Sequence, residues 1–339
     1  MKIIVYDIAV SKGGGGESIL DQYFNQAISD TKNEWWFLVS LDKYNNVEND
    51  HVHVVYVDVK RSSKIKSYFL RKKYEIFELK KAIKAIEPDE VISLQNMVVP
   101  WAKCKQTVYM HQPLQFAPVK YSFFCKEERS FAFRQHIVCR IIRRNLRKAD
   151  KIIVQTFWMK KGVAEWLPYP EEQIVVERPV FTLPVLESKN LKLDNIFFFP
   201  ANAYLHKNHQ VIVEACKLLK KKGVNDYHVQ FTLSPDSGIL AKKLFDEIQK
   251  EELPIEFIGH LDKKTLFPKY QTSIMLFPSY VETFGLPLLE AKTLGGRIIA
   301  SNLPFAHEIL DGYDSVKFVD WNDASAWADA IEKYMVKTE

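Results

Sequence analysis

The sequence has few cysteines and no long apolar run. Its four cysteines, Cys104, Cys125, Cys139 and Cys216, are scattered over 339 residues with no Cys-x-x-Cys pair. This spacing argues against a disulfide framework or a thiolate metal site and is typical of reduced thiols in a cytoplasmic protein. No run approaches the ~18 apolar residues that a membrane-spanning helix needs. The first ten residues, MKIIVYDIAV, read as a strand and lack the features of a signal peptide.

Charge is unevenly distributed along the chain. The net charge is +5, but residues 1–184 carry 29 Lys and Arg against 21 Asp and Glu, whereas residues 185–339 carry 18 against 21. Residues 60–74 hold seven basic side chains and no acid, interleaved with aromatic and aliphatic residues, and residues 140–151 hold six against one Asp. Such segments suit an anionic bilayer surface, with a solvated basic face as the simpler alternative. No nucleic-acid recognition module is recognisable.

Short apolar segments alternate with amphipathic ones, which predicts parallel sheets covered by helices. The first series has strands at 2–10, 34–41, 51–59, 90–95, 107–112 and 151–156, and helices at 17–29 and 74–86. The second has strands at 195–202, 228–234, 255–260, 272–279 and 297–301, and helices at 206–223, 238–251, 287–296 and 322–335.

The pattern restarts after an aperiodic stretch with two prolines, which predicts a linker near residues 181–194. We therefore expect two doubly wound α/β domains, residues 1–184 and 185–320. Ligands of such domains bind outside the carboxyl ends of the strands, here in the cleft between the domains. Residues 321–339 are expected to form a C-terminal helix that crosses back to the first domain.

Two loops that follow predicted first strands are candidates for phosphate binding. The first, SKGGGGES at residues 11–18, lets the backbone approach a ligand and opens a helix whose amides favour an anion. It matches neither a clean Gly-x-Gly-x-x-Gly nor a Walker A loop, and a flexible turn is the alternative. The second, residues 199–209, carries Lys207 at a helix start, where it adds a cation to the helix dipole; a solvated lysine is the alternative there. His111 ends another predicted strand, and a structural loop histidine is its alternative.

The segment FPSYVETFGLPLLEAKTLGG, residues 277–296, is the most informative. Gly285 frees the backbone so that nearby amides can point at an anion, and Pro287 suits the first turn of a helix. Glu290 lies among leucines about one turn into that helix, and an acid on an apolar side needs a partner. A carboxylate there can accept hydrogen bonds from sugar hydroxyls, whereas a capped helix with incidental acids is the alternative. Phe284 is expected to pack beneath the amides.

ETFGLPLLEA, residues 282–291, resembles the E-x7-E motif of the retaining GT-B glycosyltransferases of family 4. The surrounding order is similar too, with a Gly-rich first loop, a Lys-bearing loop after the first strand of the second domain, and FIGHL before a helix. The resemblance covers nearly the whole chain and is stronger in the second half. It implies the GT-B fold and transfer of a sugar from a nucleotide diphosphate-sugar, with retention and without an essential metal or other cofactor. In this fold residues 1–184 would form the acceptor-side domain, and residues 185–320 would form the domain that binds the nucleotide sugar.

The resemblance also implies roles for residues that match the motif positions. Glu282 would contact the donor sugar and Glu290 would hold the ribose hydroxyls, while Lys207 and the amides near Gly285 would neutralise the diphosphate. The first-domain glycines would approach the phosphates, His111 would contact the donor sugar, and the Gly259 segment would lie near the nucleobase. The predicted catalytic residues are Glu282, His111 and Lys207, and the predicted donor-binding residues are Gly14, Gly15, Gly16, Asn202, Gly259, His260, Phe284, Gly285, Leu286 and Glu290.

One position departs from the family pattern. The family often carries an Arg six residues before the Lys, and this sequence has Ala201 there. Diphosphate neutralisation would therefore depend more on Lys207.

The leading hypothesis is a glycosyltransferase that acts on a lipid-linked glycan in surface polysaccharide synthesis, such as O-antigen, capsule or exopolysaccharide. The expected location is cytoplasmic and peripheral on the inner face of the cell membrane. A soluble or protein acceptor is one alternative. Others are a nucleotide-cofactor oxidoreductase, with Asp42 as the ribose-binding acid, and a nucleotide-sugar-binding module. The sequence does not reveal the donor nucleotide and sugar, the linkage or the oligomeric state.

Overall fold

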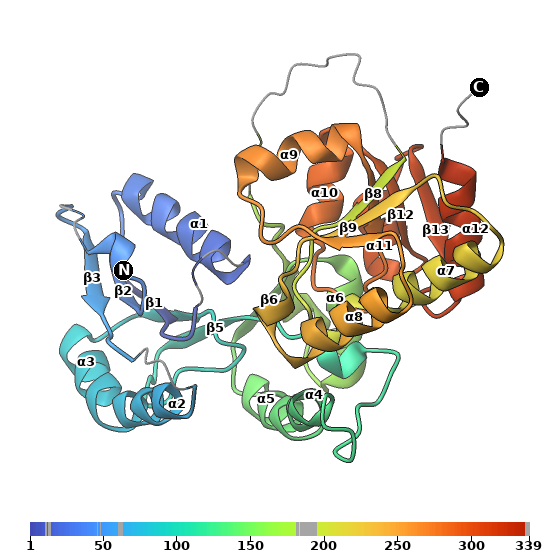
Figure 1. The fold of residues 1–339 in the computed structure, drawn as a ribbon. Coiled ribbons are helices and arrows are strands. Elements are labelled where there is room, and N and C mark those ends of the chain that lie inside the picture. The colour runs from blue at the N-terminus through green and yellow to red at the C-terminus, as the bar shows by residue number, and fades with distance from the viewer. Residues whose placement is uncertain are drawn as a thin grey trace. The chain divides into compact units, whose positions relative to one another are not determined.

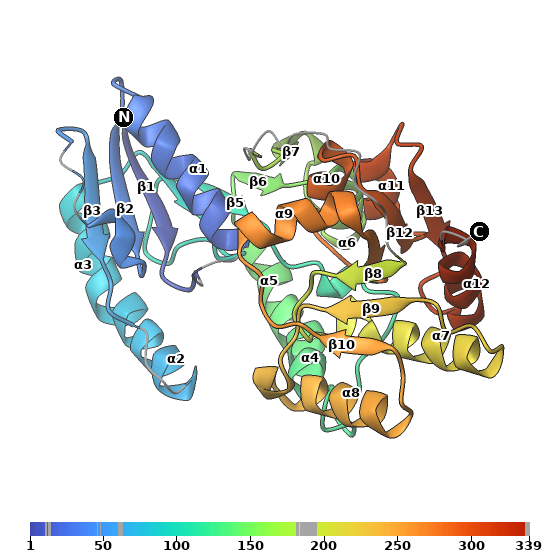
Figure 2. The same ribbon diagram turned by 45° about the horizontal axis from the view of Figure 1, so that its top comes forward.

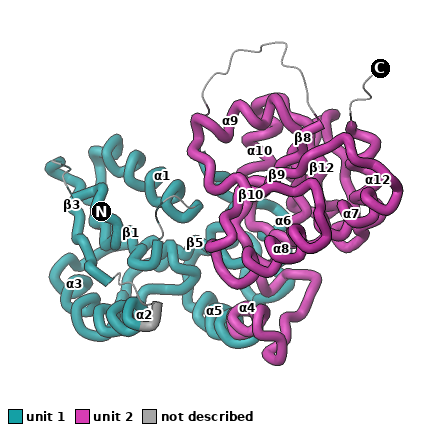
Figure 3. Tube along the Cα trace, in the orientation of Figure 1, with its two compact units in different colours: residues 1–112, 136–182 teal, residues 113–135, 183–339 magenta. Residues whose placement is uncertain are grey.

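The structure is a computed structural model that describes residues 1–10, 12, 15–45, 47, 49–59, 64–180, 183 and 195–335, without the side chains of 64 and 65. The chain forms two compact units (Figures 1 and 3). Unit 1 comprises residues 1–112 and 136–182, and unit 2 comprises residues 113–135 and 183–339. The expected linker, 181–194, lies outside the described residues except for Leu183.

Unit 1 is built on a parallel seven-stranded sheet with the order β3-β2-β1-β4-β5-β6-β7. Its strands are β1 Lys2–Asp7, β2 Glu34–Val39, β3 Val52–Tyr56, β4 Glu90–Ser93, β5 Lys105–Tyr109, β6 Lys151–Val154 and β7 Ile174–Val176. Its helices are α1 Gly15–Ser29, α2 Lys64–Lys73, α3 Leu79–Ile86, α5 Cys139–Leu146 and α6 Phe157–Trp166. A π-helical turn, Tyr74–Glu78, joins α2 to α3. The sequence did not predict α2, α5, α6 or β7 as elements.

The two faces of this sheet carry different helices (Figure 2). Side chains of α1 such as Leu20 and Phe24 pack on one face with Val5 and Phe37. The opposite face, which carries Ile4 and Tyr6, packs against α3. Alternation of side chains along β1 produces these two cores, because successive residues of a strand point to opposite faces.

Unit 2 contains a parallel six-stranded sheet with the order β10-β9-β8-β11-β12-β13. Its strands are β8 Ile196–Phe199, β9 His228–Phe231, β10 Ile255–Phe257, β11 Ile274–Phe277, β12 Arg297–Ser301 and β13 Val316–Val319. Its helices are α4 Arg129–Phe133, α7 His209–Lys221, α8 Ile239–Lys250, α9 Lys263–Thr272, α10 Leu286–Thr293, α11 Pro304–Leu310 and α12 Ala324–Tyr334. Helices α8 and α12 both contact α7, while α9 and α11 both contact α10.

The boundaries of the units differ from the expected domains in two places. Residues 113–135, expected in the first domain, pack with unit 2, where Tyr121 forms a hydrogen bond with Tyr280. The C-terminal helix, expected to cross back, is seen as α12 lying along α7 of unit 2. Within each unit, the doubly wound parallel sheet is the predicted architecture.

Candidate functional site

Two of the three predicted catalytic residues, Lys207 and Glu282, lie at the switch point of the unit 2 sheet. β8 is the first strand of this sheet, and it pairs with β11 on one side and β9 on the other. Loops that leave the carboxyl ends of β8 and β11 therefore diverge to opposite faces, which is where doubly wound sheets bind ligands. The loop after β8 carries Lys207, and the loop after β11 carries Glu282.

Lys207 and Glu282 form a close ion pair. The Lys207 Nζ lies 2.5 Å from Glu282 Oε1, and the two side chains are only 17% and 13% exposed. The ammonium also lies 5.8 Å from the centre of the Phe277 ring. Sequence reasoning placed both residues at the donor but did not foresee that they bind each other. An incoming diphosphate would compete with Glu282 for the lysine.

Backbone contacts hold the two loops together. The amide of Tyr280 donates to the carbonyl of His206 at 2.9 Å. Asn208 adopts a left-handed conformation (φ 59°) as it opens α7, and its side-chain amide donates to the carbonyls of Pro278 and Trp321. These contacts fix the position of Lys207 relative to the loop that carries Glu282.

Residues 113–135 add further contacts to these loops. The hydroxyls of Tyr121 and Tyr280 lie 2.8 Å apart in a buried hydrogen bond. The Phe131 ring lies 6.0 Å from the ring of His206. No local sequence signal identified this segment, because its partners are 75 or more residues away.

The start of α10 has the predicted backbone. Gly285 has φ 87°, a left-handed conformation that favours glycine, and it directly precedes Leu286 and Pro287 in the first turn. Its carbonyl accepts from the amide of Leu288 at 2.9 Å. Phe284 is buried at 2% exposure. The amides of this turn thus lie in the loop that carries Glu282.

Glu290 has a partner that the sequence did not reveal. Its Oε2 accepts a hydrogen bond from the hydroxyl of Tyr270 on α9 at 2.8 Å. Burial raises the pKa of the Glu290 carboxyl, and this hydrogen bond opposes the rise. Tyr270 therefore satisfies one oxygen of the acid that lies among leucines. A ribose contact through this carboxylate stays a prediction.

The remaining predicted residues of unit 2 lie in loops at the same edge of the sheet. Gly259, with φ 75°, follows β10, and its amide donates to the carbonyl of Leu233. His260 is exposed. Asn202 follows β8, is exposed, and accepts from the amide of Tyr204 through its carbonyl. Their predicted contacts with the donor are untested.

The described residues predicted in unit 1 lie at the start of α1 and in the loop after β5. Gly15 and Gly16 open α1, while Gly14 lies outside the described residues. His111 follows β5, stacks on Tyr109 with ring centroids 4.7 Å apart, and receives no partner for its buried Nε2. Burial lowers the pKa of His111 to about 4, so its ring is neutral at pH 7. A neutral imidazole has one donor and one acceptor nitrogen, so it can donate a hydrogen bond to a sugar hydroxyl or accept one from it.

Two further histidines beside Lys207 were not identified from the sequence. Burial and the nearby Lys207 charge lower the pKa of His206 to about 4 and that of His209 to about 3. His209 packs against the rings of Phe199 and Phe231. Both side chains are therefore neutral at pH 7.

The described residues contain neither a metal-binding cluster nor a helix that could span a membrane. Within the described ranges, no group of three or more His, Cys, Asp and Glu side chains could hold a metal ion. No helix in the described part of the chain has the length and apolar character needed to cross a bilayer.

The two doubly wound units define the GT-B class of fold, and solved structures confirm it. Sucrose-phosphate synthase from Thermosynechococcus elongatus aligns with a TM-score of 0.71 at 15% identity, over 98% of this chain and 89% of that one. Anabaena Alr3699/HepE, solved in complex with UDP and glucose, aligns with a TM-score of 0.68 at 14% identity, over 98% and 89%. At these identities the likeness establishes the fold.

The sequence of the second half points to a family. Residues 186–339 match the family model described as "Glycosyl transferases group 1". O-antigen chain mannosyltransferase B of Escherichia coli is 24% identical over 196 residues, which is 54% of this chain and 50% of that protein. The aligned parts span from a fifth to about half the length of the first curated relatives.

Proposed function

We propose that this protein is a retaining glycosyltransferase of family 4. It moves a sugar from a nucleotide diphosphate-sugar to an acceptor hydroxyl, in the synthesis of a surface polysaccharide. The observation that carries this proposal is the Lys207–Glu282 pair at the switch point of a sheet in the family-matched region. Gly285 and Glu290 follow in the same loop and helix.

The names of similar proteins support the substrate class. The Escherichia coli relative is an O-antigen chain mannosyltransferase, and the Anabaena structure holds UDP and glucose. A nucleotide diphosphate-sugar presents a diphosphate, a ribose and a sugar. Unit 2 offers a cation at Lys207, a partly buried carboxylate at Glu290 and a second carboxylate at Glu282 for these three groups.

Charge develops on the diphosphate as its bond to the anomeric carbon breaks. Lys207 and the amides at the start of α10 stabilise that charge where it appears, which is an electrostatic form of catalysis. The acceptor oxygen forms the new bond to the same carbon, on the same face of the sugar. Its proton passes to the departing phosphate oxygen. In this front-face route Glu282 orients the donor sugar and forms no covalent intermediate, in contrast with retaining hydrolases.

The proposed chemistry uses no metal ion or other cofactor. In many phosphate sites a bound cation is the largest local charge. Here Lys207 supplies a positive charge that is already held beside the loop of α10. His111, neutral at pH 7, is assigned a hydrogen bond to the donor sugar.

The proposed acceptor is a lipid-linked glycan at the inner, cytoplasmic face of the cell membrane. This proposal is supported by exposed apolar side chains of unit 1 that lie close to basic residues in the sequence. Tyr68 and Phe69 of α2 are 54% and 65% exposed, and Ile76 and Phe77 of the π-helical turn are 52% and 57% exposed. We call these four residues the α2 patch. α2 ends on Arg71, Lys72 and Lys73, and such a combination favours an anionic lipid surface.

Diphosphate release tests the central proposal. Purified protein is incubated with UDP-, GDP- and ADP-sugars and a membrane lipid extract, and nucleoside diphosphate and glycosylated lipid are measured. Wild-type protein should release diphosphate from at least one donor. Lys207→Ala should lower kcat by about 100-fold or more at donor saturation, the scale for losing one group that stabilises developing charge.

Lys292→Ala is the matched control, because this lysine lies on α10 but bonds the carbonyls of Ile309 and Asp311. Wild-type turnover in Lys207→Ala would contradict the mechanism. Transfer to a soluble or protein acceptor without lipid would contradict the proposed acceptor.

A further inference from the structure

The loop that carries Lys207 provides one cation for the proposed diphosphate site. Between Pro200 and His209 the sequence holds no other lysine or arginine, and Ala201 stands six residues before Lys207. The Lys207 ammonium is also paired with Glu282 at 2.5 Å, so these two side chains together carry almost no net charge. A diphosphate ester carries a negative charge on each phosphate. Its binding therefore calls for a second cation close to this pair.

Residues 113–135 place a helix against the loop after β8. The ring of Phe131, on α4, lies 6.3 Å from the ring of Tyr204 and 6.0 Å from the ring of His206, and both of these residues belong to that loop. Arg134 follows Phe131 by three positions, and residues three apart are neighbours on the surface of a helix. All four residues belong to unit 2. The packing of Phe131 therefore brings Arg134 beside the loop.

Hydrogen bonds hold the turn that begins at Arg134. The next residue, Gln135, is buried, and its side-chain amide donates to two backbone carbonyls of the same segment. The Gln135 side-chain oxygen accepts from the amide of Tyr121, whose hydroxyl is bonded to that of Tyr280 in the loop after β11. The turn itself, Arg134–Val138, is π-helical, and such turns occur often at functional sites. The backbone of Arg134 is thus fixed, while its side chain is exposed.

The charge of Arg134 acts on the same histidine as Lys207 and Glu282. Burial is the main reason that the pKa of His206 is low; the charges of Lys207 and Arg134 lower it further, and Glu282 raises it. Because such effects weaken with distance, the guanidinium lies in the neighbourhood of the Lys207–Glu282 pair. The Nδ1 of His206 is buried and has no hydrogen-bond partner in the described part of the chain. Buried polar atoms normally have one, and a bound phosphate oxygen would supply it.

Arg134 is free to bind an anion. Within the described ranges its exposed guanidinium forms neither a hydrogen bond nor an ion pair. Arg129, on the preceding helix, differs because its Nε donates to the carbonyl of Phe123 at 3.0 Å. Glu282, the acid of this group, is already bonded to Lys207. A free guanidinium presents a fork of N–H donors that matches two phosphate oxygens.

We propose that Arg134 is the second cation of the donor site and binds the diphosphate together with Lys207. The guanidinium forms a pair of hydrogen bonds with phosphate oxygens, and the Nδ1 of His206 donates to another. A distant segment of the chain thus supplies the positive charge that Ala201 does not. This inference rests on the proposed function, because it takes the diphosphate of a nucleotide sugar as the ligand.

Binding of nucleoside diphosphates tests the role of Arg134 without any transfer step. Titration calorimetry measures the affinities for UDP, GDP and ADP at several salt concentrations. Arg134→Ala should weaken binding of the diphosphate that wild type prefers by about 10- to 100-fold, the scale for a charge-assisted hydrogen-bond pair. Arg134→Lys, which keeps the charge but not the fork, should lose less. The affinity of Arg134→Ala should also depend less steeply on salt, because one ionic contact is missing.

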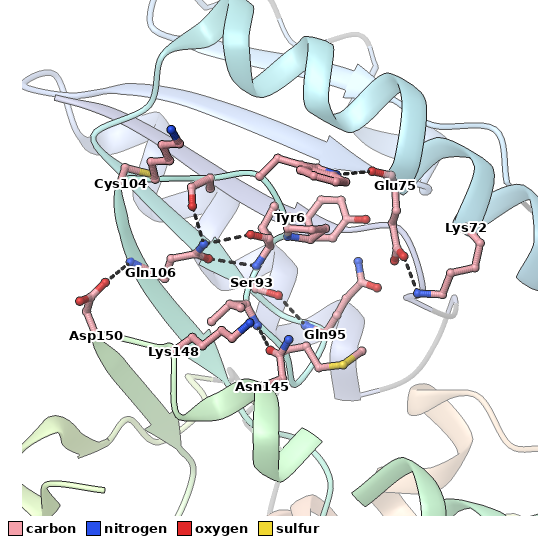
Figure 4. Close-up of a pocket in the computed structure, with 17 residues that line it drawn as sticks. Tyr6, Lys72, Glu75, Ser93, Gln95, Cys104, Gln106, Asn145, Lys148 and Asp150 are labelled. Carbon is pink, nitrogen blue, oxygen red and sulfur yellow. Dashed lines mark hydrogen bonds and ion pairs between the residues drawn. The ribbon is translucent and has the colours of Figure 1, made fainter. Parts of the chain in front are cut away.

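Two other replacements of basic residues are matched controls. Arg129→Ala removes the same charge from the same segment of unit 2. Lys148→Ala removes a charge from unit 1, where Lys148 lines a cavity of about 470 Å³ (Figure 4). Both should bind the diphosphate like wild type. Arg134→Ala should unfold at the same urea concentration as wild type, because the side chain that it removes is exposed.

The inference is overturned if Arg134→Ala binds the diphosphate as tightly as wild type while Lys207→Ala binds it weakly. That outcome leaves the proposed function standing. It is also overturned if Arg129→Ala loses as much affinity as Arg134→Ala, since the effect would then come from overall charge. If wild type binds none of the three diphosphates, the proposed function fails together with this inference.

Discussion

At the residue scale, the central feature is that Lys207 is held by Glu282 before any ligand arrives. Both side chains are largely buried, so each needs the other to offset the loss of water. The sequence identified both residues as candidates for donor binding. It could not identify Tyr270 as the partner of the nearby Glu290, because Tyr270 lies on α9.

Replacing Glu282 with Gln should tighten binding of a nucleoside diphosphate. The neutral amide leaves the Lys207 ammonium without its anionic partner, and a diphosphate then replaces the missing charge without competition. We expect a roughly 3- to 10-fold gain in affinity, about 1 kcal/mol, measured by titration calorimetry with UDP, GDP and ADP. Turnover should fall in the same variant, since the donor sugar loses its contact. Unchanged or weaker binding would show that Glu282 does not compete for Lys207.

His209 should make unit 2 sensitive to acid. Its pKa is lowered from the ordinary 6.5 to about 3 in the folded protein, so the unfolded chain binds a proton first as the pH falls. The stability contributed by the neutral ring is present above pH 6.5 and is lost as the pH falls toward 3. Between about pH 5.5 and 4 each such histidine contributes a slope of about 1.4 kcal/mol per pH unit.

The variant His209→Phe keeps a ring between Phe199 and Phe231 but has no proton to bind. Urea unfolding followed at several pH values should give a shallower loss of stability than in wild type, by the slope of one histidine. His228→Phe is the control, because His228 is exposed on β9. Parallel curves for wild type and His209→Phe would refute the account.

At the element scale, the start of α10 could be predicted from the sequence. The segments that pack around the loop between β11 and α10 could not. Gly285 and Pro287 are local signals, because the left-handed turn and the proline in the first turn depend on backbone geometry alone. Residues 113–135 carry no such signal. They join unit 2 through Tyr121 and Phe131, whose partners lie in distant parts of the chain.

Gly285→Ala should disturb both stability and donor binding. The φ of 87° is unfavourable for any residue with a Cβ, and the added carbon would lie 3.2 Å from Leu288 Cδ1. We expect a loss of about 1–2 kcal/mol in the free energy of unfolding, together with weaker nucleoside diphosphate binding. Chemical denaturation and calorimetry measure the two effects.

The variant Gly295→Ala separates the effect on stability from the effect on nucleotide binding. Gly295 has φ 74° just after α10, and a Cβ there meets no atom within 4 Å. It should lose stability similarly and bind the nucleotide normally. If both variants bind like wild type, the amides near Gly285 do not contact the diphosphate.

At the scale of the whole molecule, alternation of strands and helices was enough to predict two doubly wound sheets. Buried strands such as Phe197–Phe199 and Ile274–Phe277 are continuous apolar runs, which parallel sheets require. The boundaries of the two units were harder to predict, because the unit to which a segment belongs depends on its packing against segments that are distant in the sequence. The concentration of basic charge in the first half can also be predicted from the sequence. The sequence does not show which apolar side chains are exposed beside that charge.

The α2 patch should hold the protein on anionic membranes. Ile76 and Phe77 extend the patch from Tyr68 and Phe69 onto the π-helical turn, so apolar insertion and electrostatic attraction act together. Phe69→Ser with Phe77→Ser should reduce sedimentation with vesicles of phosphatidylglycerol and phosphatidylethanolamine by about tenfold or more, since each buried aromatic contributes about 1.5–3 kcal/mol.

Phe157→Ser is the matched control, because Phe157 is 62% exposed at the start of α6, outside the patch. It should sediment like wild type. Raising the salt concentration should weaken binding of all forms, as screening reduces the attraction of lysine and arginine for the lipid surface. Two outcomes would exclude lipid attachment through α2: the double variant binds vesicles as wild type does, or wild type stays in solution at low salt. A soluble acceptor would then be the better hypothesis for the same site.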